Sequence, residues 1–345
     1  MTIPLDQPAR STARANANIA LIKYWGKSDT RLNTPAVGSV SITLEALWTE
    51  TEVTFDSSLA ADSLLLNGIA DAAGLERVSR CLDVLRLEAG ASARASVVSR
   101  NSFPTGAGLA SSASGFAALV CAAADALGLD PPPEDLSRFA RRGSGSAARS
   151  LFGGFVAMHA GRAPDGRDSF AEPLLSAEDW PLTVVIALTA RKPKEVGSSS
   201  GMQRSAASSP YYSSWIDRSE ADVAGAKEAI SSRDFARLGT LAEHSCLKMH
   251  ALAMTSRPPL VYWNAATLVC IEAIRDLQRH GVPVFFTIDA GPQLKAVCLP
   301  EATSRVTEAL SDLPGVLEII VSGLGPGARP VESAWRSSGT PGPGR

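Results

Sequence analysis

The sequence has little of what would tie a protein to a membrane, a nucleic acid or an oxidising compartment. None of its apolar runs reaches the roughly 20 residues that span a bilayer. Its 33 basic and 35 acidic side chains leave a formal net charge of −2, whereas neutralising nucleic-acid phosphates requires a surplus of lysine and arginine. The five cysteines are scattered and mostly set among apolar residues, which is typical of reduced thiols. We therefore expect a cytoplasmic protein that binds neither a membrane nor nucleic acid.

What the sequence contains is the composition of an ordinary globular protein. Hydrophobic residues make up 45% and charged residues 20% of its 345 positions, a length that suggests about two domains. The first residues show no basic stretch followed by an apolar one, so we expect no signal peptide. Strand-like and helical segments alternate without the regular rhythm of a doubly wound sheet, which predicts an α+β fold. We expect domains at residues 11–180 and 181–322, and a mostly disordered, glycine- and proline-rich tail at 323–345.

Hydrophobic patterning predicts the main elements. Residues 110–127 are apolar nearly all round and stop at a glycine, which indicates a buried helix. Further helices are expected at 215–230, 235–254, 260–280 and 301–311. Strands are expected within 37–55 and at 152–159, 182–188, 284–289, 294–299 and 316–321.

A run of glycines and serines leads directly into the predicted helix at 110–127. Such a loop brings several backbone N–H groups together at a helix N-terminus, where the helix dipole favours an anion. A tight turn capped by serine would look similar, but Pro-x-Gly-x-Gly-Leu-x-Ser-Ser is more specific than a generic glycine-rich turn. The sequence therefore predicts a phosphate site at Gly106, Ala107, Gly108, Leu109, Ala110, Ser111 and Ser112, whose serine hydroxyls could also reach a magnesium ion.

Two lysines and a tyrosine end an apolar, strand-like run near the N-terminus. The run begins at Asn16 and gives way to Lys23, Tyr24 and Lys27. Each lysine alone is typical of a side chain that reaches solvent. Together with an arginine and an acid further along the chain, they indicate a pocket for a polyanion.

That arginine and that acid lie in two later loops. Ser146 and Arg149 would share one face of a short helical turn. The guanidinium could hold a substrate carboxylate by two parallel hydrogen bonds, or it could form an ion pair with an acid of the protein. Asp289 ends an apolar strand before Gly-Pro, where an acid often only closes a turn. Among lysines and arginines it would stay ionised and could accept or orient a hydroxyl proton during phosphoryl transfer.

Five motifs follow one another along the chain. They are Asn18-Ile19-Ala20 with residues 23–27, residues 103–113, residues 143–154, Gly201-Met202-Gln203, and Asp289-Ala290-Gly291-Pro292. With them, about residues 11–325 resemble the mevalonate diphosphate decarboxylases, of the superfamily that includes galactokinase, homoserine kinase and mevalonate kinase. The resemblance implies a small-molecule-kinase-like fold, with an N-terminal domain like ribosomal protein S5 and a C-terminal ferredoxin-like α/β sandwich. It also implies a homodimer.

The resemblance further implies ATP-dependent decarboxylation of (R)-5-diphosphomevalonate to isopentenyl diphosphate, a step of isoprenoid biosynthesis by the mevalonate pathway. Carried over to this sequence, it makes Asp289 face the tertiary hydroxyl, Lys23 complete the polar network around it, and Arg149 hold the carboxylate that leaves. The implied substrate contacts, mainly to the diphosphate, are Tyr24, Lys27, Ser144, Ser146, Arg149 and Ser198. ATP phosphates would lie in the 106–112 loop with Mg²⁺ bridging them and Ser112 as a candidate ligand.

The loop at 196–201 departs from this pattern. Some bacterial members carry an arginine there for the diphosphate, whereas Ser198-Ser199-Ser200 offers only hydroxyls. Arg191, Lys192 and Lys194 are the cations nearby in the sequence. The alternative reading is therefore a related decarboxylase or kinase that acts on mevalonate or its monophosphate. A non-catalytic, ligand-binding member would be expected to lack the acid or the arginine, and both Asp289 and Arg149 are present.

Overall fold

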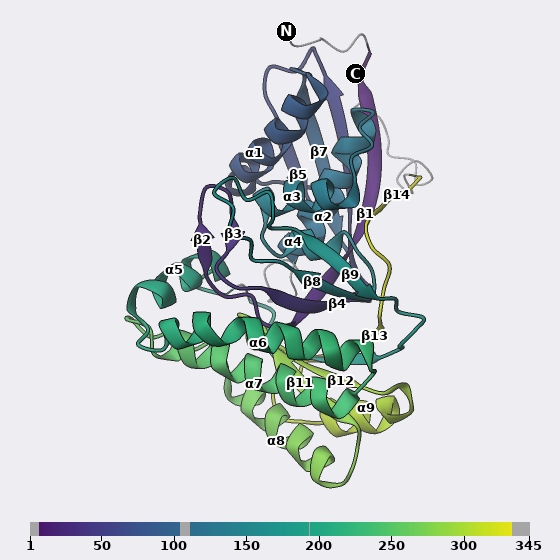
Figure 1. Cartoon of the computed structure of the whole chain (residues 1–345). Helices are drawn as coiled ribbons and strands as arrows, with labels where there is room; N and C mark the ends of the chain where they lie inside the picture. Colours follow the sequence, from purple (N-terminus) through teal and green to yellow (C-terminus); the bar gives the residue numbers. More distant parts are fainter. Residues whose placement is uncertain (1–6, 104–110, 193, 333–345) are drawn as a thin grey trace.

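The computed structural model describes residues 7–103, 111–192 and 194–332, which form two lobes that are each built on a β-sheet (Figure 1). The N-terminal lobe, drawn in purple to teal, carries helices on its larger sheet. The C-terminal lobe, drawn in green to yellow, surrounds a smaller sheet with helices. The α+β class that the alternating elements predict is confirmed.

The larger sheet has eight strands among the described residues, in the order β14-β1-β4-β7-β5-β6, with β8 paired to β4 and β9 to β8. Its backbone is the antiparallel pair β1 (Ala9–Ile22) and β4 (Ser39–Asp56). The first residues of β4 pair with β8 and its last residues with β7, so one long strand joins both ends of the sheet. The other strands are β5 (Ser63–Leu66), β6 (Ile69–Ala70), β7 (Arg94–Asn101), β8 (Phe155–Met158), β9 (Ala171–Leu175) and β14 (Arg329–Pro330).

Helices α1 (Ala72–Ala89), α2 (Ser111–Ala126) and α3 (Pro133–Gly143) pack together in the N-terminal lobe, and α4 (Ala147–Ser150) is a single turn after α3. Helix α2 is the predicted buried helix. Its alanines at 117, 118, 122 and 123 are fully buried, because small side chains let the helix approach the sheet closely. A short hairpin, β2 (Lys27–Asp29) with β3 (Thr34–Pro35), follows β1.

The smaller sheet has the order β11-β12-β10-β13. Its strands are β10 (Thr183–Leu188), β11 (Val284–Ile288), β12 (Leu294–Cys298) and β13 (Glu318–Gly323). Counted along the chain this order is second, third, first, fourth, which is that of the ferredoxin-like sandwich implied by the resemblance. The helices between these strands are α5 (Ser198–Ser208), α6 (Tyr212–Ser231), α7 (Phe235–Met254), α8 (Ala265–Arg279) and α9 (Thr303–Ser311), the last preceded by a 3₁₀ turn at Pro300–Ala302.

Alternation along β10 explains how the two lobes join. Val185 faces a core built with α8 and α9. Val184 and Ile186 face the opposite way, because successive strand residues point to opposite faces. There they share one core with Ile19 of β1 and Ile42 of β4. The two lobes are therefore packed directly on each other through apolar side chains.

The tail after residue 322 is partly ordered, which corrects the expectation of disorder for its first ten residues. Leu324 bridges to Leu44, Gly325 N–H donates to the Thr43 carbonyl at 2.8 Å, and β14 pairs with β1. A Cβ on Gly325 would lie 2.7 Å from the Cα of Glu45. Glycine therefore permits close backbone approach here and does not mark a flexible end. Residues 333–345 lie outside the described residues.

Candidate active site

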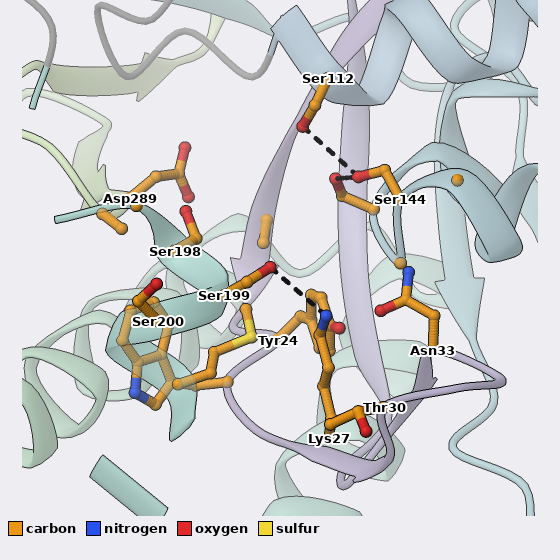
Figure 2. A pocket seen from close by; sticks show the side chains of 18 of the residues that line it. Tyr24, Lys27, Thr30, Asn33, Ser112, Ser144, Ser198, Ser199, Ser200 and Asp289 are labelled. Atoms are coloured by element: carbon orange, nitrogen blue, oxygen red, sulfur yellow. Dashed lines mark hydrogen bonds between the residues drawn. The ribbon is translucent and has the colours of Figure 1, made fainter. Parts of the chain in front are cut away.

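A cavity of about 580 Å³ lies between the lobes, a size that suits a small polar ligand. The N-terminal lobe contributes the residues that follow β1, the start of α2 and the loop that leads into α4. The C-terminal lobe contributes the start of α5 and the residue that follows β11. The described candidates that line the cavity are Lys23, Tyr24, Lys27, Ser111, Ser112, Ser144, Ser146, Arg149, Ser198 and Asp289. Figure 2 labels six of them, namely Tyr24, Lys27, Ser112, Ser144, Ser198 and Asp289. Gly106 to Ala110 lie outside the described residues.

Asp289 sits between two lysines. Its Oδ1 is 2.7 Å from Lys23 Nζ, and its Oδ2 is 3.2 Å from Lys295 Nζ. Lys23 also donates to the Ala20 carbonyl at 2.9 Å. Both lysine side chains are 1% exposed, whereas that of Asp289 is 26% exposed and faces the cavity. One lysine from each lobe thus holds the acid, and its carboxylate is accessible to a ligand in the cavity.

The lysines set the charge of this acid. Burial alone would raise the pKa of the Asp289 carboxyl, but the charges and hydrogen bonds of Lys23 and Lys295 outweigh that effect and hold the pKa well below its ordinary value. An acid among cations was expected to stay ionised, and the direction of the pKa shift agrees. Such a carboxylate accepts hydrogen bonds well and retains a proton poorly.

Neutral groups hold Arg149 in place. Its guanidinium donates to Ser39 Oγ at 2.7 Å and to Asn18 Oδ1 at 3.1 Å. Helix α4 is the short turn that was predicted, and Ser146 and Arg149 both face the cavity. Burial lowers the pKa of Arg149 to about 10, which leaves it charged at neutral pH. Its Nε has no hydrogen-bond partner among the described residues, so donor capacity remains for a ligand.

Tyr24 presents a second buried donor. Its hydroxyl has no hydrogen-bond partner among the residues that the structure describes. Burial raises the pKa of Tyr24, with the charges of Arg149 and Arg141 opposing that rise, so the phenol stays protonated. A Cβ on Gly145 would lie 2.5 Å from this hydroxyl. Glycine at 145 therefore leaves room for the tyrosine beside the cavity.

Serines connect the start of α2 with the loop before α4. Ser144 Oγ lies 3.4 Å from Ser112 Oγ and 3.2 Å from Ser146 Oγ (Figure 2). A second cavity of about 220 Å³ opens beside them, between α1, α2 and the strands β4, β5 and β7. Arg77 of α1, Ser111 and Ser112 line both cavities. The start of α2 is therefore where the two cavities meet.

The serines at 198–200 begin α5, and lysines lie against them. Lys194 Nζ donates to Ser198 Oγ at 2.9 Å and to the Ala290 carbonyl at 2.8 Å. Lys27 Nζ donates to Ser199 Oγ at 3.3 Å (Figure 2). Burial lowers the pKa of Lys194 to about 8, with Asp289 opposing the effect. The arginine-free loop thus combines hydroxyls, a helix N-terminus and two cations, which suits an anion.

Sequence reasoning missed several residues of this site. Lys295 stood in an apolar strand with nothing to mark it, and Asn18 was noticed only as part of a motif. Four further arginines line the cavity, namely Arg31, Arg77, Arg80 and Arg142. The cluster Arg141-Arg142 and the helical spacing of Arg77 and Arg80 were the available signals. Of the three cations named near the loop, Lys194 lines the cavity, whereas Arg191 pairs with Glu318 at 2.9 Å.

Two negative findings apply to residues 7–103, 111–192 and 194–332. None of the helices there has the length and apolar character that crossing a membrane requires. Nor does that part of the chain contain a group of three or more His, Cys, Asp or Glu side chains placed to hold a metal ion.

Known proteins match both lobes. Residues 15–171 match the family model of the diphosphomevalonate decarboxylase-like N-terminal domain, and residues 184–318 match that of the mevalonate 5-diphosphate decarboxylase C-terminal domain. Diphosphomevalonate decarboxylase mvd1 of Aspergillus fumigatus is 40% identical over 326 residues, covering 89% of this chain and 81% of the relative. The enzyme of Candida albicans is 38% identical, covering 82% of each chain.

Solved structures agree with these matches. Mevalonate diphosphate decarboxylase of Staphylococcus aureus has a TM-score of 0.89 at 38% identity and covers 95% of this chain and 99% of its own. The structure of MDDEF in complex with MVAPP, AMPPCP and magnesium has a TM-score of 0.87 at 39% identity, covering 94% of this chain and all of its own. The chain therefore belongs to the diphosphomevalonate decarboxylase family.

Proposed function

We propose that the protein decarboxylates (R)-5-diphosphomevalonate in an ATP-dependent reaction, giving isopentenyl diphosphate, ADP, phosphate and carbon dioxide. One observation carries this proposal. An ionised Asp289 and a guanidinium with spare donor capacity, Arg149, face the same cation-rich cavity. A substrate with a tertiary hydroxyl, a carboxylate and a diphosphate would use all three features. The solved relative that holds MVAPP and AMPPCP has the same fold.

The second cavity suits the nucleoside of ATP. It is lined by apolar side chains such as Leu64 and Phe116, with Ser99 and Asn101 as polar groups. A nucleoside there would direct its phosphates to the shared residues Arg77, Ser111 and Ser112. The proposed phosphate site at Gly106–Ser112 leads into α2 at this point. Mg²⁺ would be held chiefly by the phosphates, with the Ser112 hydroxyl within reach, and would supply neutralisation of their charge.

The substrate then lies between the lobes. Arg149 takes the carboxylate, since its planar guanidinium matches two oxygens at once. The diphosphate lies against Tyr24, Lys27 and the serines at 144, 146 and 198. The start of α5 together with Lys194 replaces an arginine in this role. A diphosphate rather than a monophosphate would use the full width of this cation-lined surface.

The chemistry follows from these placements. The γ-phosphoryl group moves to the tertiary oxygen, so that this oxygen can leave as phosphate with the electrons of its C–O bond. Positive character grows on the carbon, and the bond to the carboxylate breaks to supply the electrons of the new double bond as carbon dioxide leaves. Lys23 stays beside the reacting oxygen, and Asp289 stabilises the positive charge.

The role of Asp289 is to orient the hydroxyl rather than to keep its proton. A carboxylate between two lysines accepts the hydroxyl hydrogen bond and aims the oxygen lone pair at the phosphorus. Because its pKa is held so low, the proton passes on to a phosphate oxygen or to solvent as the bond forms. This is a positional and electrostatic contribution.

The direct test incubates the purified protein with ATP, Mg²⁺ and diphosphomevalonate and follows ADP and carbon dioxide together. Equal release of both supports the proposal. Release of ADP alone would make the protein a kinase, and release of both only from the monophosphate or from mevalonate would favour the alternative substrate. We further propose that the protein is a cytoplasmic homodimer, which sedimentation and cell fractionation would test.

A further inference from the structure

Lys295 lies behind Asp289 and outside the cavity. Its ammonium group reaches Oδ2 of the carboxylate, whereas Lys23 reaches Oδ1. Lys23 lines the cavity and Lys295 does not, although both side chains are 1% exposed. Lys295 is therefore not placed to touch a bound substrate, and its direct contact with a residue of the cavity is the one with Asp289.

The strand register brings Lys295 to this place. Lys295 of β12 is directly opposite Thr287 of β11. Asp289 comes two residues after Thr287 and so emerges on the same side of the sheet. Thr287 Oγ1 donates to the Ala20 carbonyl at 3.1 Å, the same carbonyl that accepts from Lys23. Lys295, Thr287 and Asp289 therefore lie on one face of the smaller sheet, and Lys23 contacts that face through Asp289 and the shared Ala20 carbonyl.

A fully buried lysine requires an explanation. Its neighbours in β12 are Leu294, Ala296, Val297 and Cys298, all of them buried. Burying an ammonium group costs free energy unless a charge and hydrogen bonds compensate. An apolar side chain of similar length would fill the same space without that cost. The retained charge therefore points to a role that concerns Asp289.

We propose that Lys295 is a positioning residue, which keeps Asp289 ionised and oriented while Lys23 shares its hydrogen bonds with an incoming substrate. The inference rests on the proposed function, and it assigns a different role to each of the two lysines. The lysine on the cavity side contacts the substrate. The lysine behind the acid keeps its contact with Oδ2 throughout, because no ligand can reach it.

The effect on pH dependence follows from the charges around the acid. The charged groups around Asp289 are Lys23 after β1, Lys295 of β12, Arg149 of α4 and Lys194 after β10. Its charge also acts on Cys246 and His250 of α7, which both contact the Ile288 carbonyl. Among the described residues, the ion pairs of the Asp289 carboxylate are those with the two lysines. An opposite charge in contact lowers a carboxyl pKa by about 1–3 units. Replacing Lys295 with a neutral residue therefore raises the pKa of Asp289.

The test measures kcat as a function of pH for the wild type and for Lys295→Met. We expect the acid limb to move to higher pH by about one unit or more, so that the loss of kcat is greatest at acid pH, while the KM for ATP stays within about twofold. The matched control is Lys248→Met, since Lys248 pairs with Asp222 at a distance from the cavity; its profile should follow that of the wild type. The proposal would be overturned if the pH profile of kcat for Lys295→Met had the same shape as the wild-type profile, whatever the absolute value of kcat.

A second variant and a second readout keep the test decisive. If Lys295→Met does not fold, Lys295→Gln carries the same expectation about the acid limb. Urea unfolding of Lys295→Met, Asp289→Asn and the double variant needs no substrate, and the two changes should be strongly non-additive. Additive effects would overturn the inference even if the wild type does not act on diphosphomevalonate. Failure of the proposed function would instead appear in the wild-type assay.

Discussion

Asn18 and Arg149 are joined by a hydrogen bond of 3.1 Å between residues 131 positions apart in the chain. The same amide donates from Nδ2 to the Ser146 carbonyl at 3.0 Å and to Ser150 Oγ at 2.8 Å. One side chain of β1 therefore holds the turn of α4 and its arginine together. Because the partner is an amide rather than a carboxylate, the guanidinium charge remains available to a substrate.

Replacing Asn18 with leucine should lower both activity and stability. The change removes three hydrogen bonds and leaves buried polar partners unsatisfied, at about 1–3 kcal/mol of unfolding free energy. We expect kcat to fall at least about tenfold as well, a loss of about 1.4 kcal/mol in transition-state stabilisation. Urea unfolding and steady-state kinetics measure the two effects. Asn264→Leu removes the cap of α8 and should reduce stability alone; equal kinetic losses in both variants would contradict a specific role for Asn18.

Replacing Asp289 with asparagine should abolish turnover while ATP still binds. The amide has the shape of the carboxylate but no charge to orient the hydroxyl or stabilise positive character. We expect kcat below about a tenth of the wild-type value, which is more than about 1.4 kcal/mol. Calorimetry with an ATP analogue should give an unchanged Kd. The control is Asp276→Asn, because Asp276 is an exposed acid that pairs with Arg279. A near-normal kcat for Asp289→Asn would show that the acid has no part in the mechanism.

Replacing Arg149 with lysine should lower kcat by at least about tenfold. A lysine keeps the charge but cannot hold Ser39 and Asn18 while it also contacts both oxygens of a carboxylate. The control is Arg162→Lys, because the side chain of Arg162 is 89% exposed. Comparing the steady-state rates of the two variants separates the effect of losing the guanidinium at position 149 from that of an arginine-to-lysine change at the surface. An unchanged rate would make Arg149 a structural residue.

The pKa of Lys194 predicts a pH effect on substrate binding. With a pKa of about 8, the amine is charged below that pH and becomes neutral above it. Its attraction for phosphate groups is therefore present at neutral pH and is lost as the pH rises through 8. We expect the KM for the phosphorylated substrates to rise over this range in the wild type. In Lys194→Gln the KM should already be high at neutral pH, and a wild-type KM that is flat across the range would contradict the prediction.

The ordered part of the tail can be tested by a glycine substitution. A methyl group on Gly325 would collide with the backbone of Glu45, so we expect Gly325→Ala to cost about 1–3 kcal/mol of unfolding free energy. Gly225 lies within α6 with its nearest neighbour at 3.4 Å, and Gly225→Ala should be neutral or stabilising. Chemical denaturation of both variants makes the comparison. Equal unfolding free energies for Gly325→Ala and Gly225→Ala would mean that the segment around Gly325 does not pack against Glu45 as described.

Local patterns predicted the elements well where the pattern was long. The helix expected at 235–254 has those bounds, and α2 (Ser111–Ala126) lies within the helix expected at 110–127. Glycines misled the prediction at 323–332, because glycine serves close backbone contact as well as flexibility. The strands within 37–55 proved to be one strand, β4, whose length depends on partners from three places in the chain.

The site was predictable as a set of residues but not as a geometry. Motifs singled out Asp289, Lys23 and Arg149, and the cavity brings them together. The contact of Lys295 with Asp289 depends on the register of two strands, which the apolar pattern of β12 does not reveal. The role of Asn18 depends on a partner 131 residues away. Such long-range contacts are set by packing of the whole fold rather than by local sequence.

Strand β14 returns to the edge of the larger sheet that β1 forms. It pairs with Ala13 and Arg14 of β1, and the segment before it lies on residues 151–154. The first strand can therefore gain this neighbour only after the ribosome has made Arg329 and Pro330. During synthesis the emerging first lobe carries an open sheet edge, which is a site where strands of other chains can pair. The growing chain is exposed to aggregation at this edge until β14 emerges.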